Sequence, residues 1–124
     1  MEEVQRMLQQ IEKIVAQDAR YKFEAYSFTM AGLHYTVSRL TKPRHVTGKE
    51  LCCGLKDYAL EQFGPMARTV LEYWGIRKTN DFGRIVFNLI DAELLKKSEE
   101  DTLHDFENIY DFKEAFHYEI KEEN

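Results

Sequence analysis

Apolar side chains recur at intervals of three and four residues in the first 18 positions, which is the spacing of one helical face. They are Val4, Met7, Leu8, Ile11, Ile14 and Val15. This pattern predicts an amphipathic helix over residues 2–17 within the N-terminal segment 1–18. Two heptads are too few to specify a coiled coil, so we expect the helix to dock on the chain's own core. A seam between two copies is the alternative.

The next apolar segment, residues 21–40, fits two patterns. One subset alternates as in a strand, namely Tyr21, Phe23, Tyr26, Phe28 and Met30, and another follows helical spacing, namely Tyr26, Met30, Leu33, Val37 and Leu40. A stretch of about 20 residues exceeds ordinary strands, and Asp18 is a candidate cap, so length favours one long helix. Gly32 would allow a close neighbour. The pattern leaves open a strand within this segment, and residues 41–45 are expected to form a loop.

A capping box predicts where the following helix begins. In Thr47-x-x-Glu50 the hydroxyl and the carboxylate would each accept a backbone N–H group. The expected buried face comprises Leu51, Leu55, Tyr58, Ala59 and Phe63. Gly64 is expected to end this helix and Pro65 to open the next, because glycine favours the position after a helix and proline the first turn.

Two further helices are predicted beyond Pro65. The first has Met66, Val70, Leu71 and Trp74 facing inward and ends at Gly75. The second is expected to be capped by Thr79, Asn80 or Asp81. Its apolar positions fit helical spacing most closely of all, at Phe82, Ile85, Val86, Leu89 and Ile90.

The chain becomes polar after Leu95. A short β-turn or hairpin is expected near residues 95–100, and Ser98-x-x-Asp101 is expected to begin another helix. That helix would carry Leu103, Phe106 and Tyr110, and Phe112 and Phe116 would extend an aromatic stripe that docks on the core. Residues 119–124 are expected to fray. Together these patterns predict a mainly α fold, a compact bundle of about five to six helices in a single globular domain over 1–124.

Composition adds a cellular context. The chain of 124 residues is 44% hydrophobic and 31% charged, which is ordinary for a globular protein large enough to fold without metal or disulfide. No apolar run is long enough to span a bilayer, and the acidic start is unlike a secretory signal. Cys52 and Cys53 are adjacent, a poor geometry for a mutual disulfide, so we expect them to be reduced. These features favour a cytoplasmic location without membrane contact.

Charge is distributed unevenly along the chain. The net charge is −5, but residues 99–124 carry ten acidic and two basic side chains, a balance of −8. Positive residues gather instead in the basic loop, residues 39–49. Its candidate binding residues are Arg39, Lys42, Arg44, His45 and Lys49. This loop is the first candidate surface for a protein partner.

The two helices around Gly75 also suggest a winged helix-turn-helix core. In that arrangement the major groove would be contacted by Arg77, Lys78, Arg84 and Asn88. The turn is longer than the usual three or four residues, and the expected wing and recognition helix carry several carboxylates. Because phosphate neutralisation supplies most nonspecific affinity, the acidic balance disfavours nucleic acid.

A metal site is the third hypothesis. Two motifs, Asp101-x-x-His104 and Glu114-x-x-His117, each place a carboxylate and an imidazole on one helical face. Di-iron bundles use such pairs together with further glutamates from two other helices, and those are not evident here. The sequence therefore assigns no metal or other cofactor and no catalytic residue.

A longer string of motifs resembles an uncharacterised family of small proteins found mainly in planctomycete and verrucomicrobial bacteria. The string includes Arg44-His45-Val46-Thr47-Gly48, Phe63-Gly64-Pro65-Met66-Ala67, Trp74-Gly75-Ile76, Asp81-Phe82-Gly83 and Ile85-Val86-Phe87. The resemblance runs from about Arg20 to Phe116 and implies a bacterial stand-alone domain. It implies no activity, cofactor or substrate, because the family has none assigned.

These observations favour a non-enzymatic, cytoplasmic domain, a monomer or homodimer, that binds another macromolecule. A protein partner at the basic loop is the leading hypothesis, with the acidic C-terminal segment as the second surface. The alternatives are a winged-helix-like nucleic-acid-binding protein and a carboxylate/histidine metal protein.

Overall fold

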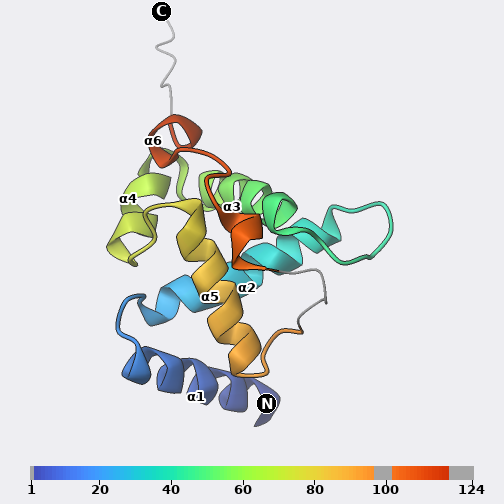
Figure 1. Cartoon of the computed structure of the whole chain (residues 1–124), viewed down its shortest axis with the longest axis vertical. Coiled ribbons are helices and arrows are strands. Elements are labelled where there is room, and N and C mark those ends of the chain that lie inside the picture. The colour runs from blue at the N-terminus through green and yellow to red at the C-terminus, as the bar shows by residue number, and fades with distance from the viewer. Residues whose placement is uncertain (1, 97–101, 118–124) are drawn as a thin grey trace, which may run out of the picture.

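The computed structural model describes residues 2–96 and 102–117, and this part of the chain is helical without strands (Figure 1). The α-helices are α1 (Glu2–Gln17), α2 (Phe23–Ser38), α3 (Gly48–Phe63), α4 (Ala67–Tyr73), α5 (Thr79–Asp91) and α6 (Phe112–Ala115). Two 3₁₀ turns complete the elements, η1 (Gly64–Met66) and η2 (Leu103–Phe106). The mainly helical class predicted from the sequence is confirmed.

Helix α2 is central to the packing. It contacts α3, α5 and α1, and Figure 1 shows α5 crossing it. The turn η2 packs on α5 and α3, which brings residues from beyond position 100 onto the first half of the chain. The core thus lies where α2, α3 and α5 meet.

The segment 21–40 forms one helix over most of its length, as its length predicted. Its buried residues follow helical spacing, at Ala25, Tyr26, Phe28, Thr29, Gly32 and Thr36. Asp18 does not cap it, contrary to expectation. The helix begins at Phe23 after Lys22, too far from Asp18, which accepts a hydrogen bond from the Arg20 N–H at 3.0 Å instead.

Helices α2 and α3 approach closely through two glycines. A Cβ atom added at Gly32 would collide with the Leu55 side chain, and one added at Gly54 would collide with Thr36. The expectation that Gly32 admits a close neighbour is confirmed. The reciprocal contact at Gly54 keeps the two helices in register.

The capping box of α3 forms as predicted. The Glu50 N–H donates to Thr47 Oγ1 at 3.1 Å, and the Thr47 N–H donates to Glu50 Oε1 at 3.0 Å. Gly64 follows α3 with a φ of 51°, and Gly75 follows α4 with a φ of 98°. Both are in the left-handed region that glycine tolerates best.

Two details predicted for the helices beyond Pro65 are wrong. Met66 is 54% exposed rather than inward, because residues 64–66 form a 3₁₀ turn whose side chains follow a different angular spacing. Helix α5 begins after Lys78, so none of the three expected caps occupies the capping position. Asp81 instead accepts the Arg77 and Lys78 N–H groups from inside the first turn, at 2.9 and 3.2 Å.

The C-terminal segment docks as expected but not as one helix. It forms η2 and α6, separated by residues that include Asn108 with a φ of 49°, a conformation that interrupts a helix. Phe106, Phe112 and Phe116 are buried. The hairpin expected near 95–100 and the helix start at Ser98 fall mainly on residues 97–101, outside the described residues, as do 119–124. Within the described residues, no helix is long and apolar enough to cross a membrane.

Candidate ligand-binding site

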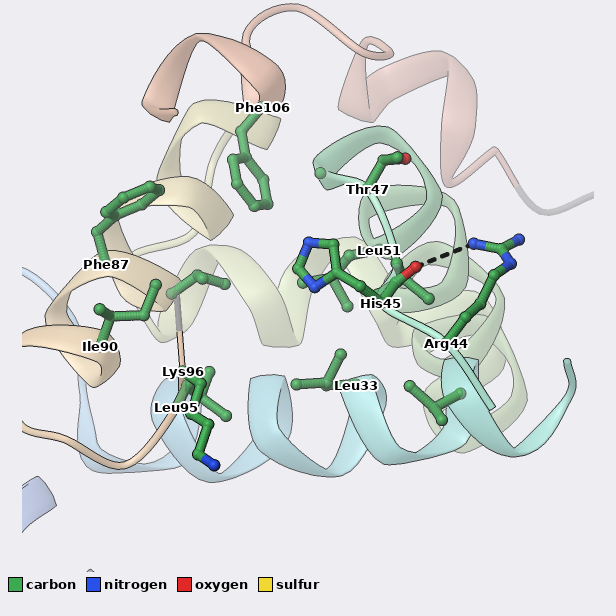
Figure 2. Close-up of a pocket in the computed structure, with 14 residues that line it drawn as sticks. Leu33, Arg44, His45, Thr47, Leu51, Phe87, Ile90, Leu95, Lys96 and Phe106 are labelled. Carbon is green, nitrogen blue, oxygen red and sulfur yellow. Dashed lines mark hydrogen bonds between the residues drawn. The ribbon is translucent and has the colours of Figure 1, made fainter. Parts of the chain in front are cut away.

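An apolar pocket of about 220 Å³ lies between α2, α3 and α5 beside the basic loop (Figure 2). Leu33 and Val37 of α2 form one wall, and Val86, Phe87 and Ile90 of α5 form another. Apart from Phe87, these residues come from the apolar faces expected from the sequence.

Other segments complete the pocket. Leu51 from the first turn of α3 lines it, and Phe106 of η2 reaches it from a segment distant in sequence. Gly48 permits this approach of η2, because a Cβ atom there would lie 2.9 Å from the Asp105 carbonyl oxygen. The long-range docking of η2 therefore helps to build the pocket.

Polar groups line the pocket on the side of the basic loop and of Lys96. Arg44, His45 and Lys96 are exposed and belong to its lining. Figure 2 shows the His45 ring turned towards the apolar side chains, whereas the Arg44 side chain extends away from them. The lining residues within 2–96 and 102–117 include no carboxylate.

A second, shallower hollow lies in the basic loop itself. It is lined by Arg39, Leu40, Thr41, Lys42 and Arg44, with a volume of about 520 Å³. Arg44 thus borders both hollows. Three of the five lining side chains are cationic and none, among the residues described, is acidic.

The two arginines of the loop have local partners. Arg39 lies 3.3 Å from Asp57 and 5.0 Å from the centroid of the Tyr35 ring. Arg44 binds Glu50 through both guanidinium nitrogens, at 3.0 and 2.7 Å. This pair and the Thr47 N–H hold the pKa of the Glu50 carboxyl down at about 2.

The two lysines of the loop differ from the arginines. Lys42 and Lys49 are exposed, and no carboxylate of the described residues lies within 4.0 Å of either ammonium group. Three of the binding residues predicted from the sequence share the hollow in the basic loop, namely Arg39, Lys42 and Arg44. His45 lines the adjoining apolar pocket. Lys49 lines neither.

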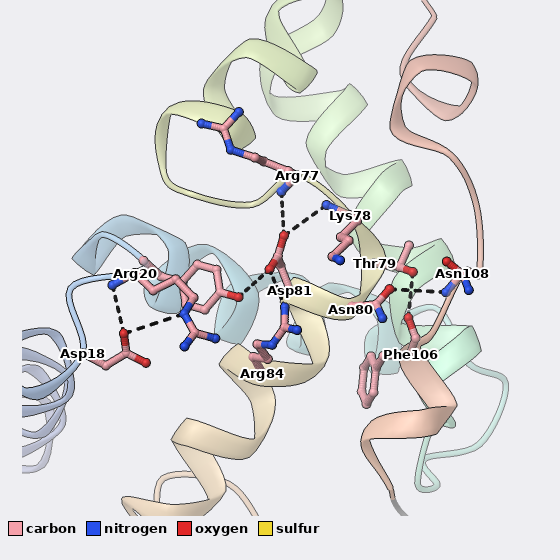
Figure 3. A network of polar contacts seen from close by, with 11 residues as sticks. Asp18, Arg20, Arg77, Lys78, Thr79, Asn80, Asp81, Arg84, Phe106 and Asn108 are labelled. Atoms are coloured by element: carbon pink, nitrogen blue, oxygen red, sulfur yellow. Dashed lines mark hydrogen bonds and ion pairs between the residues drawn. The ribbon is translucent and has the colours of Figure 1, made fainter.

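The four side chains considered as alternative nucleic-acid contacts differ in their exposure and in their hydrogen-bond partners (Figure 3). Arg77 and Lys78 have exposed side chains, but Arg84 donates to Asp81 at 3.0 Å. Asn88 is half-buried and donates its amide to the Tyr26 hydroxyl at 3.0 Å. Two of the four candidate side chains are thus already engaged within the fold.

Asp81 is the centre of this polar network. It also accepts the Tyr21 hydroxyl at 2.5 Å, and Tyr21 is fully buried. Burial, reinforced by the adjacent carboxylate, raises the pKa of Tyr21 to about 12. Nearby, Thr79 donates to the Phe106 carbonyl at 2.7 Å and accepts the Ile109 N–H. This cluster ties the first turn of α5 to Tyr21 before α2 and to the segment around η2.

The candidate metal ligands do not form a site in the described part of the chain. His104 pairs with Glu107 at 3.0 Å, Glu114 and His117 are exposed, and Asp101 lies outside the described residues. No cluster of three or more potential ligands occurs within 2–96 and 102–117.

The two cysteines have different surroundings. Cys52 is buried and Cys53 is exposed, so only Cys52 belongs to the core. Burial raises the pKa of the Cys52 thiol, so that thiol stays protonated at neutral pH.

Sequence analysis did not detect the apolar pocket. Most of its wall residues were assigned to the core by their spacing, and no motif distinguishes a core position from a pocket position. Comparison of the chain with family models, curated proteins and solved structures gives no match. The family resemblance from sequence motifs therefore stays a prediction.

Proposed function

We propose that this protein is a non-catalytic, cytoplasmic domain that binds an acidic segment of a partner protein on its basic loop. The observation that carries the proposal is the hollow between Arg39 and Arg44, whose described lining contains three cations and no carboxylate. Leu40, half-buried at the same place, offers apolar contact. Such a surface combines charge with apolar area, as protein interfaces do.

The roles of the four cations differ in this proposal. Arg39 and Arg44 are oriented by Asp57 and Glu50, so they give the surface a fixed shape and contribute little net charge. Lys42, which lines the hollow, and Lys49, which belongs to the basic loop outside the hollow, supply the attraction. Exposed charges of this kind act mainly on the rate of association and on its salt dependence.

The alternatives receive less support. A nucleic-acid surface would need Arg84 and Asn88 to leave Asp81 and Tyr26. A metal site would need ligands in addition to His104 and His117. The basic loop carries four exposed or half-exposed cations, whereas only Arg77 and Lys78 among the alternative nucleic-acid contacts have exposed side chains.

The proposal is tested by reversing the two lysines. A tagged domain is used to isolate partners from the native host at low salt, and binding of each purified partner is then measured by titration. For Lys42→Glu/Lys49→Glu we expect at least a tenfold loss of affinity for an acidic partner, because two attractions become repulsions. The affinity of the unaltered domain should also fall as salt increases.

A matched control separates local from overall charge. Arg77→Glu/Lys78→Glu changes the net charge by the same amount on another exposed surface and should leave the affinity nearly unchanged. Equal losses in both double variants would show that only net charge matters. No loss in either, or the absence of any acidic partner, would contradict the proposal.

A further inference from the structure

The apolar pocket between α2, α3 and α5 contrasts with the close packing of the same elements at other points. In two places a single added Cβ atom would collide with a neighbour, at Gly54 with Thr36 and at Gly83 with Phe106. The pocket nevertheless holds about 220 Å³. Voids of this size are few in a close-packed interior, and an apolar cavity is the usual setting of a small-molecule site.

The walls of the pocket favour an apolar occupant. Leu33 and Val37 come from α2, Ile90 from α5 and Phe106 from η2. Within the described part of the chain, no buried side-chain nitrogen or oxygen lacks a hydrogen-bond partner, so no buried side-chain polar atom is left for a polar ligand to satisfy. Water in a cavity is held by about two to four polar partners. An apolar molecule therefore gains affinity by displacing poorly held water from these walls.

The polar groups at the edge of the pocket are already used within the fold. Arg44 donates to both carboxylate oxygens of Glu50, at 3.0 and 2.7 Å, and to the His45 carbonyl oxygen at 3.0 Å. The Thr47 hydroxyl accepts the Glu50 N–H as the cap of α3, and His45 is likewise engaged. Lys96 is exposed, so water solvates its charge and salt screens it. A charged ligand would lose its hydration among the apolar walls, and this loss disfavours its binding.

We infer that the pocket binds a small uncharged molecule of hydrocarbon character, a single ring with a short aliphatic chain. The size follows from the volume, because an apolar cavity of about 150 Å³ in another protein takes up benzene and this pocket is larger. The affinity comes from removing apolar surface from water, about fourfold for each buried CH₂ group. The inference is independent of the protein partner proposed above, since it uses the apolar walls and not the charge of the basic loop.

The test compares neutral probes with charged probes of similar size. The neutral probes are benzene and propylbenzene, and the charged probes are 3-phenylpropanoate and 3-phenylpropylammonium. Binding to the full chain is followed by NMR shifts of the Leu33, Leu51 and Ile90 methyl groups. The methyl groups of Leu71, which is buried in α4 outside the pocket, serve as the reference. We expect propylbenzene to bind at least tenfold more tightly than benzene and at least tenfold more tightly than either charged probe.

Substitutions locate the binding within the pocket. Val37→Phe fills the apolar volume and should weaken propylbenzene binding by at least tenfold. Val15→Phe makes the same change at a half-buried position of α1 outside the pocket and should leave the affinity within about twofold. Lys96→Gln should also leave it within about twofold, because an uncharged ligand makes no ion pair at the edge.

Three outcomes would overturn the inference. The first is that neutral probes shift the three pocket methyl groups no more than those of Leu71. The second is that a charged probe binds as tightly as propylbenzene, which would assign recognition to the polar edge. The third is that Val15→Phe weakens binding as much as Val37→Phe. If Val37→Phe does not fold, the methyl shifts and the order of the probes in the unaltered protein still decide the question.

Discussion

Replacing Asp81 by alanine removes the acceptor around which the first turn of α5 is organised. The carboxylate accepts the Tyr21 hydroxyl, two backbone N–H groups and the Arg84 guanidinium. Asp81 is only 6% exposed, and Tyr21 is fully buried. The substitution therefore deprives a buried hydroxyl of its acceptor and removes the helix cap at the same time.

The expected loss can be assembled from these contacts. A buried hydroxyl without its partner costs about 1–3 kcal/mol, and loss of a helix cap costs about 1 kcal/mol. The Arg84 side chain is 39% exposed, so its ion pair adds less than about 1 kcal/mol. We expect Asp81→Ala to lower the free energy of unfolding by about 3 kcal/mol. For 124 residues this corresponds to a Tm about 12 °C lower.

A double-mutant cycle with Tyr21→Phe tests the reasoning. In the unaltered protein, loss of the hydroxyl should cost about 1 kcal/mol. In the Asp81→Ala background, the same change removes a group that no longer has its acceptor, so it should be neutral or stabilising. The coupling between the two positions, measured by urea unfolding, should be about 1–2 kcal/mol.

Asp91→Ala provides the matched control. Asp91 is exposed at the end of the same helix, and its replacement should change stability by less than about 0.5 kcal/mol. Additive effects of Tyr21→Phe and Asp81→Ala would refute the view that Asp81 acts by satisfying Tyr21. A loss for Asp91→Ala as large as for Asp81→Ala would refute the argument from burial.

Three further predictions follow from pKa values and packing. The pKa of Tyr21 is raised from 10 to about 12, so its stabilising effect should be complete below pH 10 and be lost as the pH rises towards 12. In a urea-unfolding pH profile, Tyr21→Phe should make the fall in stability over this range less steep. The pKa of Glu50 is lowered to about 2, so the stability contributed by its carboxylate should be present above pH 4.5 and be lost as the pH falls towards 2. Glu50→Gln should remove this part of the acid dependence of stability. Arg44→Gln should move the midpoint of this acid-induced loss to higher pH. Gly54→Ala places a Cβ against Thr36 and should destabilise the protein by about 1–3 kcal/mol; Thr36→Ala, which removes the colliding atoms, should recover part of this loss in thermal unfolding.

Much of the helical content could be predicted because it depends on local patterns. The capping box at Thr47 and Glu50 and the stop at Gly64 are properties of a few neighbouring residues, and both form as expected. Predictions failed where a different local geometry or a distant contact intervened. Asp81 caps α5 from within the helix rather than before it, and the C-terminal aromatic stripe is divided between η2 and α6.

The candidate site was predictable only in part. The gathering of positive charge between Arg39 and Lys49 is visible in the sequence because those residues are neighbours in the chain. The carboxylate that orients Arg39 was less evident from the sequence, since Asp57 lies on the next helix. The apolar pocket gave no sequence signal, because its wall residues have the same spacing as core residues.

The sequence alone thus determined the mainly helical class, the caps and stops of several helices, and the position of the basic loop. Only the tertiary structure decided that Leu33, Val37 and Ile90 line a pocket, that Phe106 contributes to it, and that His45 lies at its edge. The physical reason is that periodicity specifies which face of a helix is apolar. Whether that face is covered depends on the distances between helices, which long-range contacts set.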